Sequence, residues 1–240
     1  MSSISDEKKA LAVLAHDIKG PLSSIIDLLN IIDKGYVTDP EKSKQLISRA
    51  IKKTSILIKM VDDILDFSKL EDKSLMKREK LNIFNTLNES IALMRQYAEN
   101  RNIEIEQCEF CHNEEYVYGN HTFLMRVFNN IIMNAIKYNK KNGKIVFNSF
   151  RDKENRNIIM EISDTGIGIS EEDIENVFLI FERGSNARRN IDGSIGLGLS
   201  LVKQIVEDHE GTIEITSTLN VGTTLKITLP LYTEGENNEL

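Results

Sequence analysis

Apolar residues recur every three or four positions along the first seventy residues, in two runs. The first run comprises Leu11, Leu14, Ile18, Leu22, Ile25, Leu29 and Ile32, and the second Ile47, Ile51, Thr54, Ile58, Val61, Leu65 and Ser68. This spacing predicts two amphipathic helices. Gly35 suits the end of the first helix, and Asp39-Pro40 suits the start of the second. We therefore expect residues 1–70 to form an antiparallel helical hairpin.

Two helices leave much of both apolar stripes uncovered. We expect the hairpin to dimerise into a four-helix bundle, which would bury both stripes. The alternative is that the hairpin packs against its own downstream domain.

The pattern changes after a mostly charged stretch at residues 71–79, which is typical of a linker. Helical periods are expected over 84–99, 121–138, 171–177 and 197–209, and strands over 103–106, 144–150, 158–163, 212–217 and 223–229. We also expect a hairpin between Ile105 and Tyr118. Such alternation predicts an α/β sandwich at residues 80–232, with one mixed sheet covered by helices on one face. The acidic tail at 233–240 is expected to fray.

Composition narrows the class of protein. The chain has 240 residues, a mass of 27.3 kDa, 40% hydrophobic residues and a net charge of −7. A negative chain is a poor fit for general nucleic-acid binding, so we expect no nucleic-acid partner. No apolar run reaches the roughly 18–20 residues of a membrane span, and the start lacks a signal peptide. We expect a cytoplasmic location, either free or as the soluble part of a membrane-anchored sensor.

His16 lies beside the apolar stripe of the first predicted helix. Gly20 and Pro21 follow one turn later, where they weaken the helix and let it bend next to the imidazole. Asp17 can orient the ring or take a proton from it, which leaves the other ring nitrogen as a nucleophile. The pair is therefore a candidate catalytic site.

The predicted helix at 121–138 places four polar residues on or near one face, Asn130, Asn134, Lys137 and Tyr138. Amide oxygens suit Mg²⁺, which usually accompanies phosphates, and Lys137 could meet those phosphates. Helix capping is the bland explanation, but it fits two asparagines one turn apart poorly.

Two glycine-rich segments follow, Asp164–Gly168 at the end of a strand and Gly193–Leu199 before a helix. Free backbone amides at a helix start suit an anion. The polar and basic stretch between them, residues 181–190, predicts a lid that closes over phosphates.

Together these motifs resemble the catalytic core of a sensor histidine kinase of two-component signalling. The H box corresponds to His16–Pro21, the N box to Asn130–Tyr138, the G1 box to Asp164–Gly168, the F box to Phe181–Arg183 and the G2 box to Gly196–Leu199. The resemblance implies a phosphoacceptor hairpin followed by a Bergerat-type ATP-binding domain.

The resemblance also implies a role for each matching residue. His16 would accept the phosphoryl group, Asp17 would act as its base, and Asn134 would hold Mg²⁺ with help from Asn130. Lys137 would contact phosphate, Tyr138 would lie against adenine, and Asp164 would accept a hydrogen bond from the adenine amino group. The remaining nucleotide-binding positions would be Gly166, Gly168, Phe181, Arg183, Gly196, Leu197, Gly198 and either Thr223 or Thr224, of which we favour Thr223.

The implied reaction is ATP-dependent phosphorylation of His16, followed by transfer to an aspartate on the receiver domain of a response regulator. The family's phosphatase motif has Thr or Asn four residues after the histidine, where this chain has Gly20. We therefore expect weak phosphatase activity.

Three other functions are compatible with parts of this sequence. A gyrase-like or chaperone-like ATPase would need Glu at the position of Asn130 to activate water. A serine kinase for a separate protein would not need a histidine-bearing hairpin of its own. A catalytically silent ATP-binding scaffold is the third, although the expected motif residues are all present.

Cys108 and Cys111 precede His112 in a string that matches a haem-attachment motif. Haem attachment occurs outside the cytoplasm, and zinc would need more ligands. We interpret the pair as reduced thiols in an ordinary loop, with a redox pair as the main alternative.

Overall fold

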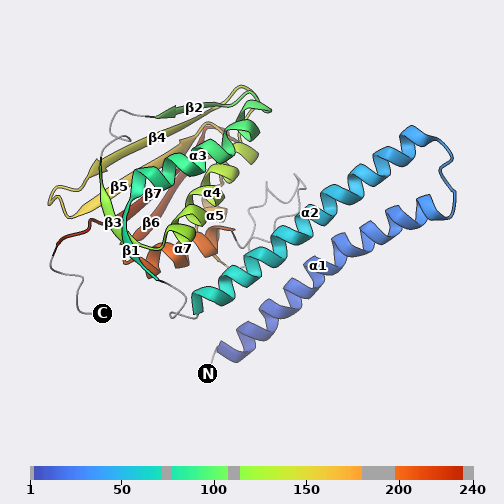
Figure 1. Ribbon diagram of the computed structural model, residues 1–240, viewed down its shortest axis with the longest axis horizontal. Coiled ribbons are helices and arrows are strands. Elements are labelled where there is room, and N and C mark those ends of the chain that lie inside the picture. Colours follow the sequence, from blue (N-terminus) through green and yellow to red (C-terminus); the bar gives the residue numbers. More distant parts are fainter. Residues whose placement is uncertain (1–2, 72–76, 108–113, 180–197, 235–240) are drawn as a thin grey trace.

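The computed structural model describes residues 3–71, 77–107, 114–179 and 198–234. A long helical hairpin, α1 (Ser3–Asp33) and α2 (Pro40–Glu71), lies beside an α/β part that holds the remaining elements (Figure 1). The predicted fold class, a helical segment followed by an α/β sandwich, is confirmed.

The turn of the hairpin follows from its sequence. Gly35 has a φ of 66°, and the N–H groups of Gly35 and Tyr36 donate to the carbonyls of Ile32 and Ile31. These two bonds close α1 with a left-handed glycine cap. The Asp39 carboxylate then accepts the N–H of Glu41 at 2.9 Å, with Pro40 as the first residue of α2.

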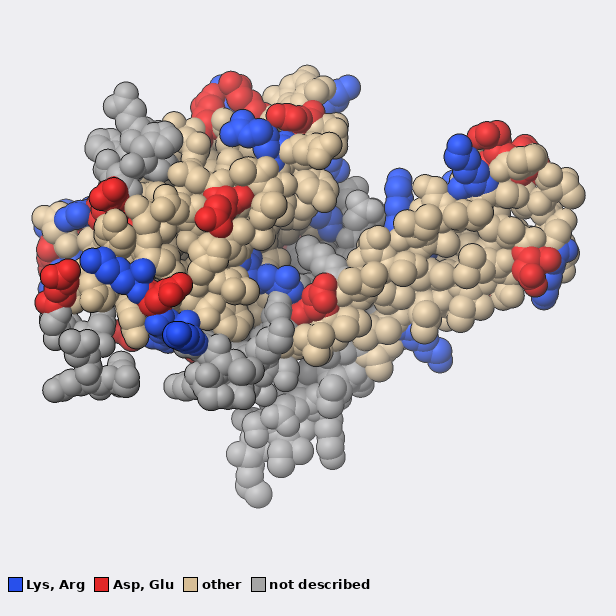
Figure 2. Space-filling model, viewed as in Figure 1, with Lys and Arg blue, Asp and Glu red and all other residues tan. Residues whose placement is uncertain are grey.

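Many apolar side chains described on the hairpin are exposed in a single copy. Met60 is buried among Ile56, Leu57 and Ile64. The exposed set comprises Leu22, Ile26, Leu29, Ile47, Ile51, Ile58, Val61 and Leu65. Figure 2 shows a largely uncharged flank between the turn of the hairpin and the α/β part. A second covering surface is therefore required to bury this apolar set.

The main sheet has five strands in the order β2 (Glu104–Gln107), β4 (Lys144–Arg151), β5 (Asn157–Asp164), β7 (Gly222–Pro230) and β6 (Thr212–Thr218). β2 pairs with β4 in parallel, and the other pairings are antiparallel. One face is covered by α3 (Ile83–Glu99), α4 (His121–Lys137) and α7 (Gly198–Asp208) (Figure 1). This is the predicted mixed sheet with helices on one face.

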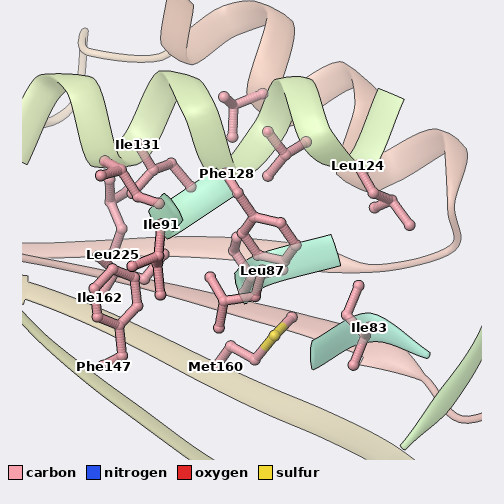
Figure 3. Close-up of a cluster of buried hydrophobic side chains, with 14 of the residues drawn as sticks. Ile83, Leu87, Ile91, Leu124, Phe128, Ile131, Phe147, Met160, Ile162 and Leu225 are labelled. Carbon is pink, nitrogen blue, oxygen red and sulfur yellow. The ribbon is translucent and has the colours of Figure 1, made fainter. Parts of the chain in front are cut away.

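The core lies between these helices and the sheet. Figure 3 shows Leu87 and Phe128 above Met160, while Ile162 and Phe147 lie below Ile91. Each such side chain contributes about 1.5–3 kcal/mol on full burial. The core fixes the buried face of α4 and leaves its opposite side for polar residues.

Two strand pairings differ from the expectation. β1 (Glu79–Asn82) and β3 (Tyr116–Gly119) form a separate two-stranded sheet, and β2 pairs with β4 through Ile105 and Ile145. The expected hairpin between Ile105 and Tyr118 is therefore wrong. Ile145 is fully buried and Ile105 packs on the same core, so burial rather than chain proximity selects the partner of β2.

Some boundaries also differ. Glu71 ends α2 and Glu79 begins β1, so the expected linker at 71–79 is one residue too long at each end. α5 spans only Glu171–Ile174, because the N–H groups of Asn176 and Val177 bond three residues back rather than four.

Candidate functional site

Asn130 lies at the centre of the polar side of α4. Its side chain is only 8% exposed, and its Nδ2 donates to the carbonyl of Arg126 at 3.0 Å. A Cβ at Gly198, the first residue of α7, would lie 3.2 Å from its Oδ1. The start of α7 therefore approaches Asn130 closely because residue 198 has no side chain.

The last turn of α4 carries Asn134, Lys137 and Tyr138, which are all half-buried. The Nζ of Lys137 lies 5.1 Å from the centre of the Tyr138 ring. The N–H of Tyr138, the C-cap residue of α4, bonds to the carbonyl of Asn134 at 2.9 Å, so the helical hydrogen bonding extends to this residue. An amide, an ammonium group and an aromatic ring are thus gathered at the end of one helix.

Asp164 ends β5 on the helix-covered face, in line with buried Ile162. Its carboxylate accepts the N–H of Gly166 at 2.7 Å and the N–H of Thr223. Burial raises the pKa of this carboxyl above its ordinary value, and the two backbone hydrogen bonds oppose the rise. Asp164 is therefore held in one orientation by the loop after β5 and by β7.

The register of β7 distinguishes Thr223 from Thr224. Thr223 pairs with Asp164, and its Oγ1 lies 2.9 Å from the Oγ of Ser217. Thr224 bonds to Ser163 through its hydroxyl, at 2.8 Å, on the opposite face of the sheet. Thr223 is consequently the threonine on the side of Asp164 and α4.

The loop after Asp164 is pressed between two other elements. The N–H of Ile167 donates to the carbonyl of Tyr138 at 3.0 Å, and the N–H of Asn220 donates to the carbonyl of Ile167 at 2.7 Å. A Cβ at Gly166 would lie 2.4 Å from the Tyr138 carbonyl oxygen. Gly168 has a φ of 65°, and a Cβ there would lie 2.1 Å from the Thr218 carbonyl oxygen. Both glycines are needed for this close packing.

A hydrogen-bonded group that sequence analysis missed ties the same loop to the end of α4. The Oδ1 of Asn139 accepts from the Oγ1 of Thr165 at 3.1 Å, and its Nδ2 donates to the carbonyl of Lys144 at 3.0 Å. The N–H of Lys144 donates to the Oγ1 of Thr165 at 2.9 Å. Asn139 comes directly after the helix predicted at 121–138. This position was the only feature of the sequence that could have indicated its role.

The described residues offer few ligands for a metal ion. No group of three or more His, Cys, Asp or Glu in the described ranges could hold a metal ion. The half-buried amide of Asn134 suits Mg²⁺ only as one ligand among phosphates and water. The site therefore fits a metal that arrives with a phosphate compound.

The structure brings nine of the predicted residues to one region, the end of α4 with its adjoining loops. They are Asn130, Asn134, Lys137, Tyr138, Asp164, Gly166, Gly168, Gly198 and Thr223.

Other predicted positions lie outside the described part of the chain. They are Phe181, Arg183, Gly196 and Leu197, together with the cysteines, Cys108 and Cys111. The backbone of His16 and Asp17 belongs to α1, but their side chains also fall outside the described set.

Two family models match the chain. Residues 6–73 match the His Kinase A (phospho-acceptor) domain, and residues 119–233 match the histidine kinase-, DNA gyrase B- and HSP90-like ATPase.

Curated relatives match over most of this chain. Drug sensory protein A of Synechocystis is 29% identical over 91% of the chain and 34% of its own length. Sensor histidine kinase WalK of Bacillus subtilis is 28% identical, with coverage of 97% and 38%, and histidine protein kinase SaeS of Staphylococcus aureus is 30% identical, with 90% and 61%. The chain thus spans between about a third and three fifths of these relatives.

Solved structures agree in fold. Histidine kinase ThkA, in complex with response regulator protein TrrA, aligns with a TM-score of 0.76 and 25% identity over 95% of this chain and 63% of that one. Acinetobacter baumannii histidine kinase AdeS aligns with a TM-score of 0.70 and 21% identity, covering 91% of this chain and 98% of that one.

No helix among the described residues has the length and apolarity that a bilayer span requires.

Proposed function

Since this chain belongs to the sensor histidine kinases of two-component signalling, we propose that it phosphorylates His16 from ATP and passes the phosphoryl group to a response regulator. One observation carries the proposal. Asp164, Thr223 and Tyr138 come from three separate elements and converge through backbone hydrogen bonds at the polar end of α4.

The proposed ATP site uses these groups in order along the nucleotide. The Asp164 carboxylate accepts from the adenine amino group, which selects adenine over guanine, and Tyr138 lies against the base. Lys137 contacts the phosphates, and Asn130 lies beside the start of α7, where backbone N–H groups favour an anion. Phe181, Arg183, Gly196 and Leu197 complete the site in this proposal, with Gly166, Gly168, Gly198 and Thr223.

Asn134 would hold Mg²⁺ together with phosphate oxygens. The ion would neutralise part of the phosphate charge during transfer. Lys137 would also neutralise phosphate charge. Such neutralisation matters because phosphoryl transfer depends mainly on positioning and charge stabilisation.

In the proposed reaction a ring nitrogen of neutral His16 attacks the γ-phosphorus of ATP. An N–P bond forms as the bond to the β–γ bridging oxygen breaks, and ADP leaves with that electron pair. Asp17 takes the remaining ring proton, so the phosphorylated imidazole does not retain a positive charge. The phosphoryl group then moves from nitrogen to an aspartate oxygen of the regulator's receiver domain.

The hairpin supplies the second half of the proposal. We infer that residues 1–70 pair with a second copy, which would bury the exposed apolar set as a four-helix bundle. The regulator would then dock on the hairpin near His16. ATP as the donor places the proposed reaction in the cytoplasm.

The test is labelling of the purified chain with γ-labelled ATP and Mg²⁺. We expect acid-labile, base-stable label that disappears in His16→Gln and persists in His121→Gln, a control at an exposed histidine paired with Glu89. Label that survives His16→Gln would overturn the assignment. ATP binding without any label would favour the scaffold function, and absence of ATP binding would overturn the nucleotide site.

A further inference from the structure

The end of α4 presents an electrostatic problem for the proposed nucleotide site. The last carbonyl groups of a helix carry partial negative charge, equivalent to about half an elementary charge. Lys137 and Tyr138, which we assign to phosphate and base, lie at this same end. An anionic nucleotide would therefore bind close to the unfavourable pole of α4.

Arg101 is bonded directly to these carbonyl groups. Its Nη1 donates to the carbonyl oxygen of Ile136 at 2.7 Å and to that of Lys137 at 2.6 Å. Both are short charge-assisted hydrogen bonds. A full positive charge thus lies against the carbonyls of the last turn, and it also fixes the backbone from which the Lys137 side chain projects.

The backbone around Arg101 is held rigidly. Its own N–H and that of Ile103 donate to the carbonyl of Ala98, and Asn102 between them has a φ of 55°. Ala98 and Ile103 are both buried in the core. The turn that ends α3 therefore fixes the backbone of Arg101, whose side chain reaches the end of α4.

The same segment contacts the loop after α4. The N–H of Glu104 donates to the carbonyl of Gly143 at 2.9 Å. Gly143 lies against Asn139, since a Cβ there would fall 2.1 Å from the Asn139 Oδ1. The α3–β2 turn thus contacts the chain both before Tyr138, through Arg101, and after it, through Glu104.

We propose that Arg101 is a positioning residue for the nucleotide, acting through the last turn of α4 and Lys137. It offsets the negative end of the helix and holds Lys137 where the phosphates bind. This inference rests on the proposed ATP site. It goes beyond that site because Arg101 belongs to none of the motifs that define it.

If Arg101 were only a structural helix cap, its replacement would also lower the stability of the protein. Stability alone therefore does not test the inference. The distinguishing property is coupling to Lys137. If Arg101 acts by placing the Lys137 ammonium group and compensating charge near it, its effect on nucleotide affinity shrinks when Lys137 is absent.

The experiment uses the full chain and a fluorescent ATP analogue with Mg²⁺. We expect Arg101→Met to raise the dissociation constant about three- to tenfold, and Arg101→Lys to restore part of the loss. The labelling rate at saturating ATP should also fall, because a displaced Lys137 stabilises less charge during transfer. Arg95→Met is the matched control, at an exposed arginine of α3, and should bind as the parent chain does.

A double-mutant cycle completes the test. Arg101→Met in a Lys137→Ala background should raise the dissociation constant by less than it does in the parent background, because only the compensation of the helix end remains to be lost. Higher salt should reduce the effect of Arg101→Met in the parent background. Equal affinities for Arg101→Met and Arg95→Met, or full additivity with Lys137→Ala, would overturn the inference while leaving the ATP site intact. A parent chain that binds no analogue would instead overturn the proposed function.

Discussion

The backbone N–H of Asn120 donates to the Nε2 of His209 at 3.0 Å, joining the start of α4 to the residue after α7. The Nδ1 of the same ring lies 2.7 Å from the carbonyl of Ile205. Because an N–H can only donate and a carbonyl can only accept, the ring must be neutral with its proton on Nδ1. Gly119 permits this packing, since a Cβ there would lie 2.8 Å from the His209 ring.

Acid should destabilise the fold through His209. The side chain is only 3% exposed, and burial lowers the pKa of the imidazole. The cation of Arg78 lowers this pKa further, against the hydrogen bond to Ile205 and the carboxylate of Glu210. The unfolded chain takes up a proton near pH 6.5 whereas the folded chain resists it. Stability is therefore present above that pH and is lost as pH falls below it.

Urea unfolding at pH 8 and pH 5.5 measures this effect. His209→Gln should be less stable than the parent at pH 8, because a buried pair of hydrogen bonds is disturbed, at a cost of about 1–3 kcal/mol. Between pH 8 and pH 5.5, the free energy of unfolding should fall less for His209→Gln than for the parent. An unchanged pH dependence in His209→Gln, matching that of an exposed-site control at His121, would contradict the prediction.

Periodicity predicted the long helices because each one gathers its apolar residues on one stripe, which α3, α4 and α7 bury against the core. The motifs predicted the residues around Asp164 and Asn134. The pairing of the strands was harder to predict from the sequence. β2 and β4 pair in parallel although α4 and other elements separate them in the sequence, and no local pattern encodes that choice.

The bond between Asn120 and His209 spans 89 residues, so nothing near either residue indicated it. Arg101 was missed for a related reason. Its significance lies in two backbone carbonyls of another helix, and backbone acceptors leave no trace in side-chain identity. Such positions become visible only when the fold brings distant segments together.

Asp164→Asn should separate nucleotide recognition from stability. Asn keeps an oxygen that can accept the N–H of Gly166, and it removes a carboxylate whose charged form is disfavoured by burial. We expect a melting temperature equal to or above that of the parent chain. The affinity for ATP should fall at least about tenfold, because a charge-assisted acceptor for the adenine amino group is lost.

Thermal unfolding and analogue binding on the same samples provide this check. Ser163→Ala is a suitable control, because Ser163 bonds to Thr224 on the opposite face of the sheet. If Asp164→Asn binds ATP as tightly as the parent, the assignment of Asp164 to the adenine is wrong.

The apolar flank of the hairpin should dimerise the chain. Ile58 on α2 is 58% exposed in a single copy, and Leu93 on α3 is exposed to the same 58%. Ile58→Glu should weaken the dimer at least about tenfold, since an ionised carboxylate would be buried between two copies. Leu93→Glu should leave the dimer intact. Sedimentation equilibrium of both variants measures this difference, and dissociation by Leu93→Glu alone would move the interface to the α/β part.

Gly20 should limit the removal of phosphate from the regulator. A Cβ built at this position meets nothing within 4 Å, and Gly20 is exposed on α1, so a polar side chain can be added without a clash. Replacement by Thr also removes part of the cost of glycine inside a helix, which is about 0.8–1 kcal/mol relative to Ala. Gly20→Thr should therefore fold at least as well as the parent and supply the hydroxyl that can orient an attacking water.

The measurement follows label on a receiver domain that has accepted it from the chain, after ATP is removed and ADP is added. Gly20→Thr should speed the loss of label by about tenfold, the scale of one added water-positioning contact at about 1.4 kcal/mol. Gly20→Ala is the matched control, because it adds the Cβ and the helix propensity without a polar group, and its rate should equal that of the parent. Equal acceleration by Gly20→Ala would assign the effect to helix rigidity, and fast loss of label with the parent chain would show that Gly20 imposes no such limit.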